Sequence, residues 1–390
     1  MISSKKYMQY CQRCIMPNTK PDLSFDSKGI CNACRNYEKR RKINWKSRSK
    51  ELAGILKKYR SKNGSNYDCI IPVSGGKDSH FQTITMLNMG MNPLCITSTT
   101  DMLSDIGRQN IENLKRLGVD YIEVTDNPVI RRKMNRLALR QIGDISWPEH
   151  VSIFTFPIQI AVKFNIPLII WGENSQHEYG GPAKAVKDNV LNRRWLEEFG
   201  GMLGLRVSDL IGQEGIEKKH LILYSYPQEA ELTKAGVRGI FLGYYVPWDG
   251  YHNALVAQGY GFRTYHRTIE GSLVNYENLD NYQTGIHDYF KFLKYGFGRT
   301  TDLACLHIRR GRLTRDEGND LVKRLDGKFP WTYLGFPLEK VLDEIDISLD
   351  EFIKICDRFT NKRLFLKSSR GELIKDKDGN LTKINYDNSD

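Results

Sequence analysis

Ser74-Gly75-Gly76-Lys77-Asp78-Ser79 decides the predicted fold, because it joins two segments with different hydrophobic periodicities. Residues 67–73 (YDCIIPV) are apolar and β-branched, which predicts a buried strand. Residues 80–90 (HFQTITMLNMG) place apolar side chains at three-residue spacing before a glycine, which predicts an amphipathic helix. The six residues are therefore expected to turn from a strand into a helix N-terminus, where free N–H groups and the helix dipole favour phosphate.

The residue types in this turn indicate how a phosphate would be held. Its two glycines allow close approach of the backbone, Lys77 adds a positive charge, and Ser74 and Ser79 add hydroxyl donors. A Walker A loop would carry Ser or Thr after the lysine, whereas Asp78 follows it here. An aspartate beside a phosphate requires a cation between them, so the pattern predicts Mg²⁺ at Asp78. A glycine-rich turn with solvated charges is the alternative.

The turn resembles the SGGKDS signature of the PP-loop ATP pyrophosphatases, which cleave ATP between the α and β phosphates. The resemblance implies that residues 74–79 bind ATP and that Lys77 and Asp78 act in catalysis.

Downstream of the turn, predicted strands and helices alternate. The pattern favours an α/β fold with a doubly wound parallel sheet, covered on both faces, whose ligands bind at the strand C-termini. The further strands are expected at 93–98, 121–124, 167–171 and 239–243, and the helices at 105–118, from 128 to about 143, and 154–164.

Polar residues follow two of these strands directly. Ser98, Thr99 and Asp101 come after the second strand and are predicted adenosine contacts. After the fourth strand, Glu173 is a candidate metal ligand or base, and Asn174 a candidate partner of a substrate amide.

Three other segments offer candidate substrate contacts. Glu178, followed by a tyrosine and two glycines, is expected to line a substrate loop. Residues 244–252 interleave aromatic rings with a carboxylate, which suits a sugar ring, although an aromatic packing cluster explains them equally well. Residues 294–315 are basic and suit a diphosphate or a carboxylate, with an exposed helix face as the alternative. The residues predicted from the last two segments are Tyr245, Trp248, Asp249, Arg299, Arg309 and Arg310.

Four of the eight cysteines form a C-x₂-C-x₁₆-C-x₂-C pattern. Cys11, Cys14, Cys31 and Cys34 would complete a closed tetrahedral shell, which predicts a small ribbon around structural Zn²⁺. The remaining cysteines lie far apart and are expected to be buried, so the chain carries no disulfide framework.

These features divide the chain into four predicted parts. They are a zinc ribbon at 1–38, a basic helical linker at 39–66, a PP-loop domain at 67–260 and a mostly helical substrate or partner region at 261–390. The net charge of +12 arises largely in the linker and is expected to be a solvated helix face. No signal sequence or membrane span is predicted, which favours a cytoplasmic protein.

The order of segments resembles the N-acetyl sugar amidotransferase family of the WbpG and PseA type, from Cys11 to about Phe365. The resemblance rests on the cysteine ribbon, the basic helix, the SGGKDS turn, GENSQHEYG at 172–180 and KYGFGRTTDLACLHIRRGRLTR at 294–315. It implies conversion of an acetamido sugar, free or nucleotide-linked, to an acetamidino sugar in lipopolysaccharide O-antigen or flagellar glycan synthesis. It also implies ATP, Mg²⁺ and ammonia from a glutaminase with a synthase-like partner (HisH/HisF-like subunits).

The implied chemistry needs no nucleophilic side chain. The amide oxygen would take AMP from ATP with release of pyrophosphate, and ammonia would then displace AMP. No cysteine lies in a G-x-C-x-G turn typical of a glutaminase, so ammonia is expected from a partner in trans.

A PP-loop enzyme that thiolates tRNA is the alternative, because such enzymes are basic and carry zinc cysteines. They also need reactive cysteines, and here only Cys95, Cys305 and Cys356 are scattered downstream of the turn. A nucleic-acid partner is therefore not expected.

Overall fold

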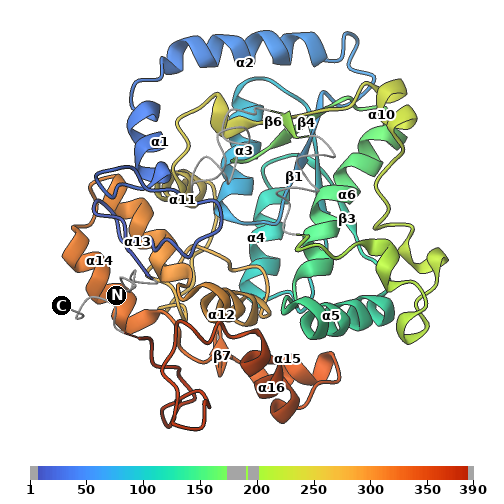
Figure 1. Ribbon diagram of the computed structural model, residues 1–390. Helices are drawn as coiled ribbons and strands as arrows, with labels where there is room; N and C mark the ends of the chain where they lie inside the picture. Colours follow the sequence, from blue (N-terminus) through green and yellow to red (C-terminus); the bar gives the residue numbers. More distant parts are fainter. Residues whose placement is uncertain (1–7, 174–189, 192–201, 385–390) are drawn as a thin grey trace.

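The computed structural model describes residues 8–173, 190–191 and 202–384 (Figure 1). Its centre is a six-stranded sheet in the order β3-β2-β1-β4-β6-β5, in which β5 alone runs antiparallel. The strands are β1 (Cys69–Pro72), β2 (Pro93–Ser98), β3 (Asp120–Val124), β4 (Leu168–Trp171), β5 (Val190–Leu191) and β6 (Arg238–Phe241). The α/β class and the five parallel strands confirm the prediction, whereas the short β5 was not predicted.

The strand order reverses beside β1, which pairs with β2 on one side and β4 on the other. In open α/β sheets, the crevice at such a reversal is where ligands bind. The SGGKDS turn follows β1 directly, so the fold places it at this crevice.

Alternation along the strands explains why both faces of the sheet are covered. Ile71 packs with Leu52 of α2 (Trp45–Tyr59) and Met86 of α3 (Lys77–Asn88). Its neighbour Ile70 points the other way and packs with Ile158 of α6 (Trp147–Phe164). Full burial of such a side chain contributes about 1.5–3 kcal/mol, and Ile70 and Ile71 are both fully buried. The sheet is therefore doubly wound.

Local capping signals set several helix limits. Asn127 caps α5 (Pro128–Ile142), which ends at Gly143 with φ of 60°. Ser348 caps α16 (Leu349–Phe359), because its side chain accepts from the Glu351 N–H. In contrast, α6 begins seven residues before the predicted start at 154, because Pro148 is tolerated in a first helical turn.

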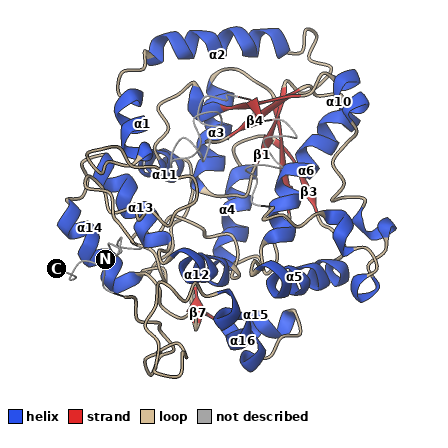
Figure 2. Cartoon of the chain, in the orientation of Figure 1, coloured by secondary structure: helices blue, strands red, loops and turns tan. Residues whose placement is uncertain are grey.

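The C-terminal third is mostly helical, as predicted, and lies beside the sheet (Figures 1 and 2). Its core joins α12 and α16 to Leu139 of α5, so hydrophobic packing continues across the predicted boundary at residue 260. The other helices and strands are α1 (Asn32–Arg40), α4 (Asp105–Lys115), α10 (Glu229–Ala235), α11 (Gly250–Gly259), α12 (Thr284–Tyr295), α13 (Arg299–Arg309), α14 (Arg315–Leu325), β7 (Thr332–Tyr333), β8 (Phe336–Pro337) and α15 (Leu338–Glu344). Short 3₁₀ turns span Val207–Leu210, Gln213–Gly215, Lys218–Leu221 and Leu242–Tyr244.

Within the described ranges, none of the helices combines the length and the apolar character that a bilayer crossing requires.

Candidate active site

The turn after β1 has the backbone geometry of an anion cradle. Gly75 adopts φ of 84°, and a Cβ there would lie 2.8 Å from Cγ1 of Ile111, so only glycine fits. Gly76 caps α3 without any side-chain hydrogen bond, which leaves the N–H groups of the first turn for a ligand. The Ser74 N–H donates to Ser79 Oγ at 2.9 Å and closes the turn.

Lys77 lies at the base of this cradle between two carboxylates. Its Nζ is 2.6 Å from Asp78 Oδ2 and 2.8 Å from Glu277 Oε1, and the residue is only 5% exposed. Burial alone would lower the pKa of Lys77, but Asp78 and Glu277 outweigh it and raise that pKa above its usual value. The other Asp78 oxygen accepts from Asn253 Nδ2 of α11 at 2.7 Å. Lys77 is thus a fixed positive charge.

Glu173 follows β4 and reaches the same crevice. Burial raises the pKa of Glu173 to about 7, and the charge of Asp78 adds to the effect. A carboxyl group that titrates near neutral pH suits proton transfer. The backbone beside it is held to the segment after β6, because the Gly243 N–H donates to the Gly172 carbonyl at 3.0 Å and extends the pairing of β4 with β6.

The raised pKa of Glu173 predicts a specific dependence of stability on pH. The folded chain holds this proton up to about pH 7, whereas an unfolded glutamate loses it near 4.5. The contribution of the protonated Glu173 carboxyl group to the free energy of unfolding is therefore fully present at low pH and is lost as pH rises through about 7. We expect Glu173→Gln to raise the melting temperature relative to wild type more at pH 8 than at pH 5. Equal differences at the two pH values, measured by calorimetry, would contradict the shift.

The predicted adenosine contacts lie at the end of β2, next to β1. Ser98 Oγ is 2.7 Å from Ser152 Oγ, and Thr99 Oγ1 is 2.9 Å from Thr125 Oγ1. Asp101 accepts from the buried Arg131 at 2.7 Å, which fixes its carboxylate. The structure brings these three residues to the same edge of the sheet as the Gly-rich turn.

The predicted aromatic sugar contacts have other neighbours. Tyr245 is fully buried and Trp248 is 4% exposed, and both pack in the core between the sheet and α2 and α3. Asp249 caps α11 through the Tyr251 N–H and forms an ion pair with Arg312 at 2.6 Å. These contacts agree with the alternative interpretation of residues 244–252, in which the aromatic rings form a packing cluster.

The three predicted arginines separate in space. Arg309 is 5% exposed and lies 4.0 Å from Cys14 Sγ. Arg310 donates to the Trp248 carbonyl at 3.3 Å and lies 3.5 Å from Asp249. Arg299 instead lines a cavity, so among the three it is the one placed to meet a ligand.

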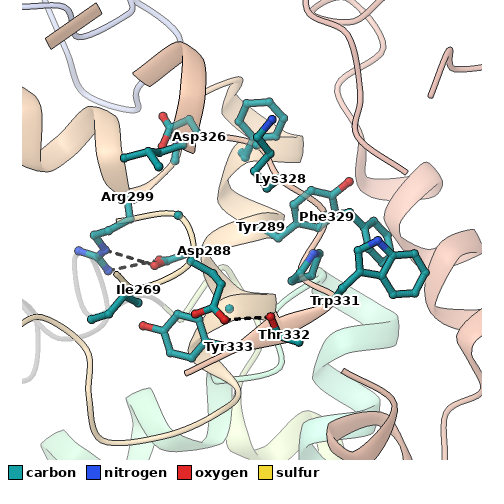
Figure 3. Close-up of a pocket in the computed structure, with 18 of the residues that line it drawn as sticks. Ile269, Asp288, Tyr289, Arg299, Asp326, Lys328, Phe329, Trp331, Thr332 and Tyr333 are labelled. Carbon is teal, nitrogen blue, oxygen red and sulfur yellow. Dashed lines mark hydrogen bonds and ion pairs between the residues drawn. The ribbon is translucent and has the colours of Figure 1, made fainter. Parts of the chain in front are cut away.

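The cavity beside Arg299 holds about 400 Å³ and lies between α12, the start of α13 and the loop before β7 (Figure 3). Arg299 forms an ion pair with Asp288 across its wall at 3.3 Å. Aromatic rings form another wall, and Trp331 among them is 44% exposed. The Tyr333 hydroxyl donates to the Asn278 carbonyl at 3.0 Å, and Asn278 directly follows Glu277, so one backbone segment links the cavity wall to the Lys77 site.

The four N-terminal cysteines converge as predicted. All are fully buried, and the Sγ–Sγ distances are 3.9 Å for Cys11–Cys34 and 3.8 Å for Cys14–Cys31. Four thiolates 2.3 Å from a tetrahedral Zn²⁺ would lie about 3.8 Å apart. The cluster therefore fits zinc.

Sequence reasoning missed Glu277 and Asn253, which complete the surroundings of Lys77 and Asp78. Glu277 lies in an irregular segment that carries no motif, and Asn253 lies inside a helix, so only the fold brings them to the turn. The predictions for Asn174 and Glu178 fall outside the described residues.

The chain is thus an α/β protein with buried charged side chains at the crevice of its sheet and a cluster of four cysteines that could hold a metal ion. Residues 270–376 match the family model described as the C-terminal domain of WbpG-like lipopolysaccharide (LPS) biosynthesis proteins. This match confirms the predicted WbpG-type resemblance over the C-terminal part of the chain. It includes Arg299 and most of the cavity wall.

A curated relative is an uncharacterized protein of Methanocaldococcus jannaschii, 27% identical over 151 residues. The match covers 35% of this chain, and the chain spans about half (54%) of the length of that relative.

Proposed function

We propose that the chain is a PP-loop N-acetyl sugar amidotransferase that uses ATP and ammonia to convert an acetamido sugar into an acetamidino sugar. The observation that carries the proposal is Lys77, fixed between Asp78 and Glu277 at an uncapped helix N-terminus. A buried cation of this kind can stabilise the charge that develops when pyrophosphate leaves. The match at residues 270–376 supports a sugar substrate.

In the first step, the amide oxygen of the sugar attacks the α phosphorus of ATP, and the bond to pyrophosphate breaks. The N–H proton of the amide leaves as the imidate forms, and we assign Glu173 as its acceptor, since a carboxyl group with a pKa of about 7 can exchange a proton near neutral pH. Ammonia then adds to the imidate carbon and AMP leaves, which yields the amidine. The sum is ATP plus amide plus ammonia to AMP, pyrophosphate and amidine, and the amide oxygen leaves in AMP.

The residues of the turn also fit magnesium. Asp78 presents carboxylate oxygens beside the expected phosphates, and each of them keeps a lone pair beyond its contact with Lys77 or Asn253. Bound there, Mg²⁺ would neutralise phosphate charge. Ser98, Thr99 and Asp101 would contact the adenosine.

We further propose that the cavity beside Arg299 binds the sugar. Trp331 and Tyr333 offer ring faces to C–H groups, while Lys328 and Arg299 suit a phosphate or carboxylate on the substrate. The adjoining Asn278–Glu277 segment connects this cavity with Lys77.

The burial of the cysteines favours this proposal over tRNA thiolation. Sulfur transfer requires an accessible thiolate. Cys95, Cys305 and Cys356 are at most 3% exposed, and burial raises the pKa of the Cys95 thiol to about 12. The reaction proposed here needs none of them.

Substrate dependence is the direct test. We expect pyrophosphate release from ATP to require both an acetamido sugar and ammonia, measured by a coupled pyrophosphate assay with ammonium salt in place of the glutaminase. Cys356→Ala should change the rate less than about twofold, because burial makes that thiol unreactive. ATP turnover stimulated by tRNA alone, or abolished in a folded Cys356→Ala variant, would refute the assignment.

A further inference from the structure

A second group of metal-ligand side chains lies away from the cysteine cluster. Asp144 precedes α6, His150 is in its first turns, and His287 is on α12. Their ligand atoms all lie within 4.8 Å of one another. The group thus joins the sheet domain to the region matched by the C-terminal family model.

The distances in this group suit a small divalent ion. His287 Nδ1 is 2.9 Å and His150 Nδ1 is 3.5 Å from the two Asp144 oxygens. Ligand atoms 2.0–2.1 Å from a tetrahedral Zn²⁺ lie about 3.4 Å apart, between these two values. Adjustments of about half an ångström would therefore let all three bind one ion.

One nitrogen in the group makes no hydrogen bond. His150 Nδ1 is buried, and its contact with Asp144 Oδ2 at 3.5 Å is too long and poorly aligned to count as one. Asp144, only 3% exposed, is already oriented because its Oδ1 accepts from the Ser146 N–H at 3.0 Å. A bound cation would give His150 Nδ1 a ligand bond and would also neutralise the buried Asp144 carboxylate.

We propose that Asp144, His150 and His287 form a second metal site, which takes Zn²⁺ or a similar divalent transition metal. Two imidazoles and one carboxylate are a ligand set that such ions favour. The three residues leave one tetrahedral position for water, and the histidines are only half-buried, so solvent can reach the ion. This site is separate from the ribbon and does not depend on the proposed amidotransferase reaction.

Metal stoichiometry of the full chain tests the proposal. The protein is stripped of metal, reconstituted with excess Zn²⁺, desalted and measured by mass spectrometry. We expect about two zinc ions per chain in wild type and about one in His150→Ala/His287→Ala. The matched control is His252→Ala/His266→Ala, which removes two exposed histidines elsewhere and should keep two ions.

Cobalt substitution distinguishes the two sites, and it also shows whether a variant has lost the second site or has misfolded. Thiolate-to-cobalt absorption reports the cysteine cluster, and it should be unchanged in the His150→Ala/His287→Ala variant. His150→Gln, which keeps the helix and changes only a half-exposed side chain, should weaken the second binding step at least about tenfold. One zinc per wild-type chain, or two zinc ions retained without the histidines, would overturn the proposal.

Discussion

Lys77→Met is expected to lower pyrophosphate release at least about 100-fold at saturating ATP and sugar, because the leaving pyrophosphate loses its fixed countercharge. The measurement is the initial rate of the coupled assay under single-turnover and steady-state conditions. Arginine is not an equivalent replacement, since the site between Asp78 and Glu277 is fitted to a compact ammonium group.

The same substitution leaves two carboxylates facing each other, and removing one partner of a buried ion pair costs about 3–5 kcal/mol. Loss of activity could then reflect unfolding. The double variant Lys77→Met/Glu277→Gln removes one negative charge as well, so it should recover stability but not activity. If the double variant regained turnover along with its melting temperature, Lys77 would be a structural cation only.

Where local signals are strong, the sequence predicts the structure closely. The run 93–98 predicts β2 at its observed bounds, because the strand preferences there agree with the packing. The sequence likewise predicts the SGGKDS turn, because its glycines, its charged residues and the start of α3 all lie within six residues.

Pairings between distant segments could not be predicted. Nothing near Glu277 in the sequence marks it as the partner of Lys77, because the contact exists only once the segment before α12 folds over the sheet. His287 and Asp144 meet for the same reason.

Residue type alone also failed to separate binding from packing. Tyr245 and Trp248 have the composition of a sugar platform, yet their rings fill the core over β6, where their burial stabilises the sheet. Arg309 has the composition of an anion ligand, yet it faces the cysteine cluster. Four thiolates around Zn²⁺ would carry a net negative charge, which the buried Arg309 would offset.

The largest stability effect is expected at that cluster. Cys11→Ser/Cys34→Ser should lose the zinc of the ribbon and unfold it, because structural zinc sites contribute about 10–16 kcal/mol of apparent binding free energy. The sheet domain has separate hydrophobic cores and should stay folded. We therefore expect an early melting transition to vanish and residues before α2 to become sensitive to protease.

The ribbon should also affect the cavity, because one helix connects them. α13 carries Arg309 against the cysteines at its C-terminal end and Arg299 at the cavity at its N-terminal end. Loss of zinc should thus raise the KM for the sugar more than it lowers kcat. Cys356→Ala, a buried cysteine outside the cluster, is the matched control and should keep full zinc content. A zinc-free double variant with wild-type protease resistance and wild-type KM would show that the cysteines neither hold the ribbon nor position α13.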